Sequence, residues 1–347
     1  MRLQSLLSKE NNNLDIFRVL AACMVIYGHA YAIVPGSGNS DLVYRMLGFD
    51  YSGSLAVKIF FFLSGLVVTN SLLTKNNPAS FAIARFFRIW PALTITTLIT
   101  ALLLGPLSTK LTVGQYFSAP ETWSYVWQNA LMKIQFNLPG VFAELHYPHV
   151  LNGSLWTIPH EVCAYIILLA LYMLHVFKSR AAASIMFMLI AADPLLSNKI
   201  LFTWRPANHE VDLLAPCFAF GSLLAIYKDR IVINAQLVIG SWLIYWLLQQ
   251  HSINFYIFYF ALFCSILYLS GQRFMLRLKP GSDISYGIYL WGFPIQQSIA
   301  WLYPGQSIAF NQISSILIAA MRGLASWHLI EKHGIKLGNN LGKRLTS

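Results

Sequence analysis

Charged residues are scarce in this chain, and acidic residues are the scarcer kind. Of its 347 residues only 11% are charged, 56% are hydrophobic and the mean hydropathy is +0.56. Soluble domains carry about 25% charged residues, so this composition excludes an ordinary soluble protein. We therefore expect a protein that is built for a lipid bilayer.

Other features are missing as well. The four cysteines lie singly in apolar runs and show no metal-ligand spacing, which predicts reduced, buried thiols and no metal site: Cys23, Cys163, Cys217 and Cys264. A cleavable signal peptide is not expected, because Asp15 and Arg18 interrupt the first apolar run. The inverted repeat that marks many transporters is not found.

Long apolar runs are abundant. A helix that crosses a bilayer needs about 20 residues. Ten runs approach this length, at about 14–34, 55–74, 90–107, 157–177, 181–197, 211–227, 231–249, 253–270, 284–303 and 308–330. We therefore predict an all-α integral membrane protein, with residues 1–347 forming a single multi-pass domain of about ten transmembrane helices.

The net charge of +11 indicates either a nucleic-acid partner or basic loops beside a membrane. With the N-terminus in the cytoplasm, 16 of the Lys and Arg residues lie inside, and Arg18 and Arg322 lie within spans. Six lie outside, namely Arg45, Lys58, Lys110, Lys133, Lys199 and Arg205. This is the positive-inside pattern. It predicts an N-in, C-in protein of the plasma membrane (the inner membrane of a bacterium) and needs no nucleic acid.

The longest connection, at about 108–151, is then an outer loop. It is rich in aromatic residues: Tyr116, Phe117, Trp123, Tyr125, Trp127 and Tyr147. One interpretation is an aromatic belt at the lipid headgroups. The other is a stacking platform for a sugar acceptor, since loops of this length are often functional.

The first span, "LDIFRVLAACMVIYGH", carries three polar residues that a lipid-facing helix would avoid. Asp15 and Arg18 are i, i+3 neighbours and can pair, and a snorkelling arginine with its salt-bridged aspartate is one interpretation. His29 follows Arg18 by eleven residues and falls on the same helix face. Inside a membrane bundle, such a histidine favours a proton-handling role.

The segment "ARFFRIWPAL" places Arg85 and Arg88 one turn apart, just ahead of Pro91. Because proline favours the first turn of a helix, we expect the pair at the N-terminus of the third span on the cytoplasmic side. Two guanidinium groups at a helix N-terminus form an anion site, most naturally for phosphate. Ordinary positive-inside anchoring is the alternative.

Two later segments also carry polar groups. In "NGSLWTIPHE", Pro159 suits the start of the fourth span, so Glu161 should lie near its outer end, at the depth of His29. A carboxylate that holds an imidazole is the orienting device of general-base catalysis. In "ISYGIYLWGFPIQQ", Pro294 should kink a helix whose polar residues line a cavity wall: Tyr289, Gln296 and Gln297.

Together with "KIFFFLSGLVVTNSL" and "HLIEKHGIKL", these segments resemble the acyltransferase-3 family of polytopic membrane O-acyltransferases, which modify cell-surface carbohydrates. The six motifs occur in family order and span nearly the whole chain. The sequence departs from the family twice. Gly292 stands where many members have a histidine, and His333 stands where many have a proline after the closing I-E-K. Some members append an extracellular esterase-like domain, and we expect a stand-alone form here.

The resemblance implies roles for individual residues. His29 would be the catalytic base, and Glu161, in a W-x-x-x-x-E segment that begins at Trp156, an essential acid. Arg85 and Arg88 would hold the phosphates of acyl-CoA, with Arg18 lining the donor channel. Further residues of the matched motifs would line the cavity: Asp15, Ser285, Tyr286 and Tyr289. No metal is implied.

The expected reaction moves an acyl group, most often acetyl in this family, from cytoplasmic acyl-CoA to a carbohydrate hydroxyl at the outer face. Arg18 and His29 lie three turns apart, so we expect the thiol-ended arm of coenzyme A to thread up the bundle toward His29. The alternatives are a proton-coupled polytopic transporter, or a relay that hands the acyl group to a separate chain. The acyl group, the acceptor and the oligomeric state are not specified by the sequence.

Overall fold

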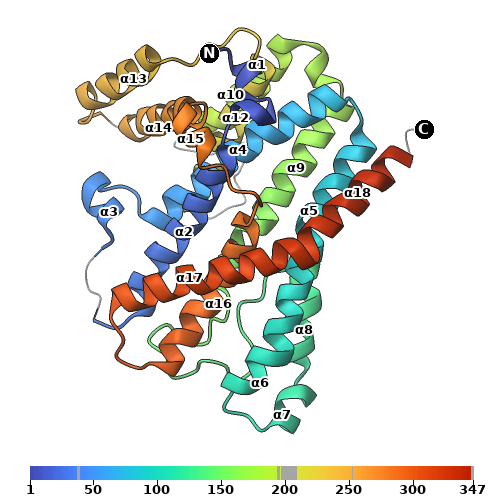
Figure 1. Cartoon of the computed structure of the whole chain (residues 1–347), viewed down its shortest axis with the longest axis vertical. Coiled ribbons are helices and arrows are strands. Elements are labelled where there is room, and N and C mark those ends of the chain that lie inside the picture. The colour runs from blue at the N-terminus through green and yellow to red at the C-terminus, as the bar shows by residue number, and fades with distance from the viewer. Residues whose placement is uncertain (37–39, 194–195, 197–208, 252, 345–347) are drawn as a thin grey trace. The chain divides into compact units, whose positions relative to one another are not determined.

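The computed structural model describes residues 1–36, 40–193, 196, 209–251 and 253–344. Within these ranges the chain is helical, and β structure is limited to isolated bridges such as Thr109–Val141 (Figure 1). The all-α prediction is confirmed for this part of the chain. Lys199, Arg205 and the end of the apolar run at 181–197 lie outside the described residues.

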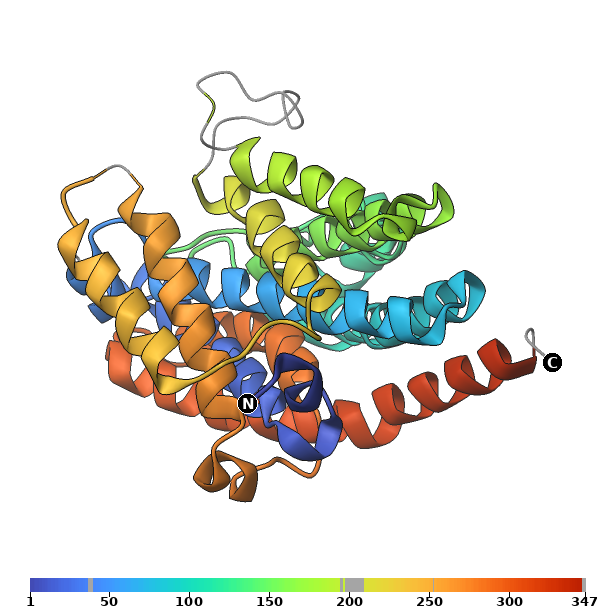
Figure 2. The same ribbon diagram turned by 90° about the horizontal axis from the view of Figure 1, so that it is seen from above.

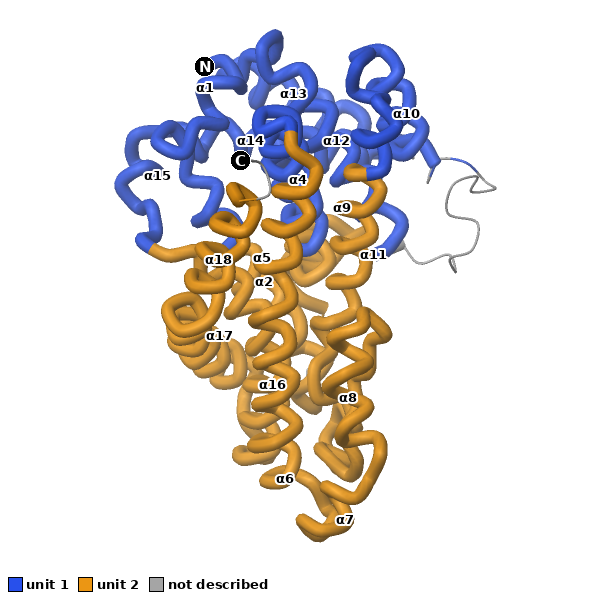
Figure 3. Tube along the Cα trace, turned by 90° about the vertical axis from the view of Figure 1, so that its right-hand side faces the viewer, with its two compact units in different colours: residues 1–20, 57–76, 170–281 blue, residues 21–56, 77–169, 282–347 orange. Residues whose placement is uncertain are grey.

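The helices divide into two compact units (Figure 3). Unit 1 comprises residues 1–20, 57–76 and 170–281, and unit 2 comprises residues 21–56, 77–169 and 282–347. Unit 1 holds α1 (Leu3–Leu6), most of α4 (Ser52–Lys75), α10 (Arg180–Ala192), α11 (His209–Asp212), α12 (Leu214–Ile226), α13 (Ala235–Leu247), α14 (Asn254–Ser270) and α15 (Arg273–Arg277). Unit 2 holds most of α2 (Leu14–Ile33) and α9 (Ile158–Met173), with α3 (Leu42–Leu47), α5 (Pro78–Ile99), α6 (Gly105–Ser108), α7 (Val113–Ser118), α8 (Pro120–Ala130), α16 (Ser285–Leu302), α17 (Ile308–Ser326) and α18 (Lys332–Arg344).

In unit 1, α4 and α12 approach closely through two glycines. A Cβ on Gly65 would lie 2.1 Å from the Phe218 carbonyl oxygen, and one on Gly221 would lie 2.3 Å from that of Phe62. Such small residues let helix backbones meet directly, as is usual in membrane bundles. Helices α13 and α14 lie side by side in both views (Figures 1 and 2).

One lysine of unit 1 was misplaced by the sequence analysis. Lys58 is not in an outer loop, because it lies inside α4 with no exposed surface. Its ammonium lies 5.5 Å from the centre of the Tyr259 ring, so a cation–π contact contributes to its burial. The four cysteines are free thiols, buried or half-buried, as predicted.

All ten predicted apolar runs contain a helix. Among the described residues, five helical segments are long and apolar enough to cross a membrane: Leu14–Ile33, Ser52–Lys75, Pro78–Ser108, Gly153–Met173 and Ile308–Arg344. Three further apolar helices are shorter: Arg180–Ala192, Ala235–Leu247 and Asn254–Ser270. These helices are consistent with a membrane protein, whereas ten crossings and the N-in, C-in orientation remain predictions.

Helix α5 begins twelve residues before the predicted start at 90. The Asn77 side chain accepts a hydrogen bond from the Ser80 N–H at 2.7 Å, and Pro78 occupies the first turn. This cap and proline are the true start signals, and Pro91 lies in the helix interior. The expected helix N-terminus beside Arg85 and Arg88 is therefore wrong, because both residues lie two to three turns inside α5.

Helix α18 packs against α5 through glycines at spacings of four. A Cβ on Gly338 would lie 2.9 Å from Phe87 Cβ, and one on Gly342 would lie 2.8 Å from Ser80 Oγ. Gly334 lies against the carbonyl of Phe87, which loses its helical donor because Pro91 has no N–H. The glycine face of α18 thus fixes the part of α5 that carries the arginine pair.

The connection at 108–151 is folded rather than open. It forms α7 and α8 and has its own core, in which Tyr116 and Tyr125 are fully buried. The Trp90 indole N–H of α5 donates to the Ala130 carbonyl at the end of α8 at 2.8 Å. Because Trp90 lies in the middle of α5, α8 runs back along the C-terminal half of that helix.

Candidate active site

His29 lies in the last turns of α2, within unit 2, and is half-buried. Its ring makes an edge contact with Phe293 of α16, with the ring centres 5.1 Å apart. Among the described residues, nothing hydrogen-bonds to its buried Nδ1. An imidazole nitrogen without a partner is available for a proton, as the predicted base requires.

The contact between α2 and α16 explains the departure at position 292. A Cβ on Gly292 would lie 2.7 Å from the Ile26 side chain, so the two helices meet without room for a larger residue. Nearby, the buried Gln296 amide donates to the Ile26 carbonyl at 2.8 Å. The second histidine that many family members have could not occupy position 292 in this packing.

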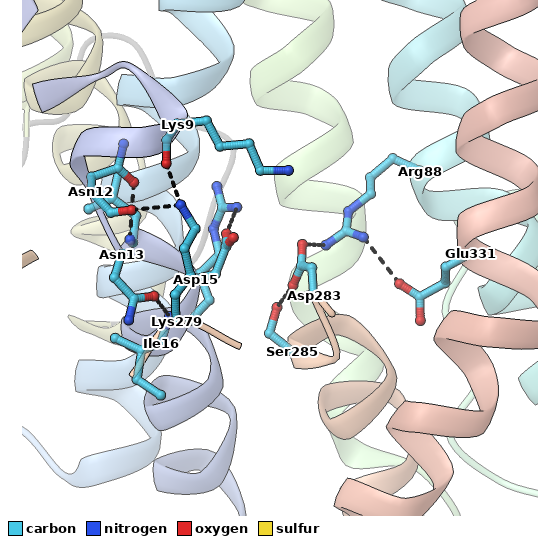
Figure 4. Close-up of polar contacts among 12 residues, drawn as sticks. Lys9, Asn12, Asn13, Asp15, Ile16, Arg88, Lys279, Asp283, Ser285 and Glu331 are labelled. Carbon is cyan, nitrogen blue, oxygen red and sulfur yellow. Dashed lines mark hydrogen bonds and ion pairs between the residues drawn. The ribbon is translucent and has the colours of Figure 1, made fainter. Parts of the chain in front are cut away.

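Arg88 is held by two carboxylates. Its guanidinium donates to Asp283 at 2.7 Å and to Glu331 at 3.1 Å, as Figure 4 shows. The other oxygen of each carboxylate accepts a serine hydroxyl: Ser285 binds Asp283 at 2.7 Å, and Ser326 binds Glu331 at 2.9 Å. Since Glu331 is only 2% exposed, the arginine charge balances a buried acid.

Arg85 has different surroundings. Its guanidinium lies 5.9 Å from the centre of the Tyr165 ring of α9. No hydrogen bond or ion pair joins Arg85 to another described residue, and its Nε is buried without a partner. The two arginines of the R-x-x-R pair therefore differ, because Arg88 is neutralised and Arg85 is not.

Glu161 lies with the arginines and not with His29. The Tyr165 hydroxyl donates to the Glu161 carboxylate, and Glu161 is close enough to Arg88 and Tyr289 for direct electrostatic interaction. No described hydrogen bond or ion pair joins Glu161 to His29, so the structure does not show the predicted pairing. Glu161 sits in the first turn of α9.

One face of α16 joins these groups. Tyr286, Tyr289 and Phe293 follow one another at i, i+3 and i+7 and so share a helix face. The Arg88 guanidinium lies 5.6 Å from the centre of the Tyr286 ring at one end of this face, and His29 contacts Phe293 at the other. Tyr286 and Phe293 are seven positions apart, which corresponds to about 10 Å of helix.

The remaining predicted residues have structural partners. The Tyr286 hydroxyl donates to the Ile89 carbonyl at 3.1 Å, and Tyr289 donates to the Ser154 carbonyl at 2.7 Å. Half-buried Trp156 packs edge-on against His160, with ring centres 5.6 Å apart. In unit 1, Asp15 and Arg18 form the predicted i, i+3 ion pair at 3.5 Å and are both partly exposed.

Three participants were missed by the sequence analysis: Asp283, Glu331 and Tyr165. Asp283 and Glu331 lie 195 and 243 residues from Arg88, so no local periodicity connects them. For Glu331, the available signal was the general rule that a carboxylate in an apolar helix requires a partner.

Comparison with known proteins identifies the family of this chain. The model of the acyltransferase domain matches residues 11–325. The chain belongs to the acyltransferase-3 family. It is 27% identical to the O-acetyl transferase of Shigella phage Sf6, over 93% of this chain and 96% of the relative. It is also 27% identical to Nodulation protein 10 of Rhizobium leguminosarum bv. viciae, over 98% of this chain and 97% of the relative. No solved structure matches it.

The family assignment makes this protein a membrane O-acyltransferase. It favours the enzyme over the proton-coupled transporter considered above.

Proposed function

We propose that this acyltransferase moves an acyl group, most simply acetyl, from cytoplasmic acyl-CoA to a hydroxyl group of a carbohydrate outside the plasma membrane. The name of the phage relative supports acetyl as the group transferred. The observation that carries the proposal is the shared face of α16, which has Arg88 at one end and His29, with its Nδ1 unpaired, at the other.

Arg85 supplies the positive charge for the donor. A phosphate requires a cation that is not already neutralised, and Arg85 has no acidic partner among the described residues. Arg88 has a structural role instead, because its ion pairs link α5 to Asp283, just before α16, and to Glu331, just before α18. Arg18 lies in unit 1, and its role in donor binding stays a prediction.

Glu161 acts through Tyr165 in this proposal. The Tyr165 hydroxyl donates to Glu161 while its ring faces Arg85, so the carboxylate holds the ring that positions the guanidinium. Glu161 is therefore a positioning residue of the donor half, and not the group that orients the imidazole.

The acyl thioester extends along α16 from the arginine end to His29. His29 takes the proton of an acceptor hydroxyl as its oxygen attacks the acyl carbon. The C–S bond then breaks, and the coenzyme A thiolate takes a proton from the imidazolium as the ester leaves. Neutral His29 is restored, and no net proton is gained or lost.

Product analysis tests the proposal. Surface polysaccharide from cells with and without the protein should differ by ester-linked acyl groups in mass spectra, and only the sample from producing cells should lose them on mild alkaline treatment. Purified protein in proteoliposomes with radiolabelled acetyl-CoA should label the same glycan. The proposed function would be overturned if the polysaccharide of producing cells carried no additional acyl groups and the glycan in proteoliposomes acquired no label.

A further inference from the structure

The connection at 108–151 places the ring of Tyr147 near His29. Phe293 contacts both: its ring centre lies 5.1 Å from that of His29 and 5.9 Å from that of Tyr147, edge-on in each case. The distance between the ring centres of His29 and Tyr147 therefore cannot exceed the sum of these two distances.

Other aromatic residues of the connection have different surroundings. Tyr116 and Tyr125 fill its core, and Phe117 packs against that core. Trp123 and Trp127 are about half exposed on α8. Tyr147 is the residue of this aromatic set whose ring contacts Phe293, the residue that also contacts the proposed base.

The backbone around Tyr147 is held in place. The amide of Gln297, which has no exposed surface, donates to the carbonyls of Tyr147 and Val150 at 2.7 and 2.8 Å. Asn152 donates to the Leu290 carbonyl at 2.9 Å, and Gly153 leaves room for the Phe293 ring. Two amide side chains therefore fix this segment along α16.

Tyr147 is 39% exposed, whereas its neighbour Phe293 is 4% exposed. None of the described hydrogen bonds involves the Tyr147 hydroxyl. An exposed aromatic ring on a fixed backbone, with a polar tip, is suited to an amphipathic partner. A sugar ring has this chemistry, with C–H groups on its faces and hydroxyl groups at its edge.

We propose that Tyr147 is the stacking platform for the acceptor sugar, and that it sets which acceptor hydroxyl reaches His29. This inference rests on the proposed function and adds the residue that recognises its acceptor. A sugar stacked on Tyr147 presents its edge toward the Phe293–His29 contact, so its ring orientation selects the hydroxyl that is acylated.

Steady-state kinetics with purified protein tests this role. The probes are acetyl-CoA and the methyl glycosides of rhamnose, glucose, galactose and N-acetylglucosamine. Tyr147→Ala should raise the acceptor KM about tenfold, because the stacking face is lost. Tyr147→Phe should stay near the wild-type value. The KM for acetyl-CoA and the slow hydrolysis of acetyl-CoA without acceptor should not change in either variant.

Trp127→Ala is the matched control, since it removes an exposed aromatic ring of the same connection and should leave the acceptor KM unchanged. An unchanged acceptor KM in Tyr147→Ala would overturn the inference, as would a Tyr147→Phe variant that is as impaired as Tyr147→Ala. If the wild type acylates none of the glycosides and saturation-transfer NMR detects none bound, the proposed function fails, and this inference fails with it.

Discussion

Arg85 and Arg88 are one turn apart on α5, yet their surroundings give them different tasks. Arg88 is bound by Asp283 and Glu331, whereas Arg85 faces the ring of Tyr165 and has no acidic partner among the described residues. Removing one member of a buried ion pair is costly because it leaves the other charge uncompensated. Removing an unpaired arginine that binds a ligand lowers the affinity for that ligand instead.

We expect Arg85→Ala to weaken coenzyme A binding by about 10- to 100-fold, which corresponds to the loss of one charged hydrogen bond, with little change in thermal stability. Arg88→Met should destabilise the protein by about 3–5 kcal/mol, because Glu331 is left buried without its counter-charge. Calorimetry with coenzyme A and thermal unfolding in detergent measure the two effects.

Arg88→Met combined with Glu331→Gln is the control and should recover part of the stability. Equal effects of the two single substitutions on both measurements would contradict this division of roles.

His29→Ala should lower the transfer rate by about 10²–10⁴-fold, since the general base is lost. Coenzyme A binding should be retained, because His29 contacts the opposite end of the shared α16 face from Arg88. The measurement is the initial rate of glycan acylation by purified protein, with calorimetric donor binding as the folding control. A near wild-type rate would show that His29 is structural.

Glu161→Gln should lower donor affinity as well as rate. The Tyr165 hydroxyl binds Glu161 and its ring faces Arg85, so a weaker carboxylate contact releases the ring. Tyr165→Phe should reproduce the loss of affinity, because it removes the same hydrogen bond. If Glu161→Gln abolishes transfer while donor binding is fully retained, Glu161 acts in the acyl-transfer step and its assignment here is wrong.

At the scale of helices, α18 places Glu331 beside Arg88. Glu331 ends a short π-helical turn, Trp327–Glu331, between α17 and α18, and Gly334, Gly338 and Gly342 then bring α18 onto α5. The i, i+4 glycine spacing is the familiar device for close helix contact in membranes. Backbone contact of this kind tolerates no side chain at the central glycine.

Gly338→Leu should separate α18 from α5 and weaken the Arg88–Glu331 pair, because even a Cβ there lies 2.9 Å from Phe87. We expect a lower unfolding temperature and reduced transfer. The control is Gly240→Leu, which adds a side chain in open space on α13. Gly305 is not a suitable control position, because its φ is +83°. A Gly338→Leu protein as stable as Gly240→Leu would contradict the role of this glycine face.

The sequence was sufficient to predict where the helices lie, whereas the contacts of the candidate site were predicted only in part. Apolar runs reveal where helices lie, so all ten predicted segments contain one. The start of α5 was misread because Pro91 and Pro78 give the same local signal, and only the Asn77 cap distinguishes them. The pairing of Arg88 with Asp283 and Glu331, and the position of Glu161, depend on how helices distant in sequence pack, which periodicity along one helix does not determine.

At the scale of the whole molecule, the account requires donor and acceptor to approach from opposite faces of the membrane. The Lys and Arg distribution predicts that the arginine pair lies at the cytoplasmic side and the 108–151 connection outside. Within unit 2, that connection supplies the Tyr147 segment on α16, while Arg88 lies toward the start of the same helix. A carrier would move an intact molecule across, whereas this enzyme should move only an acyl group.

The most direct test of this account is transfer in proteoliposomes of uniform orientation. Radiolabelled acetyl-CoA is supplied only at the cytoplasmic face, and glycan only at the opposite face. We expect labelled glycan at the face opposite the cytoplasmic one and free coenzyme A at the cytoplasmic face. Vesicles that carry the His29→Ala protein should form neither product. Labelled glycan that forms only when donor and acceptor share one side would contradict the account.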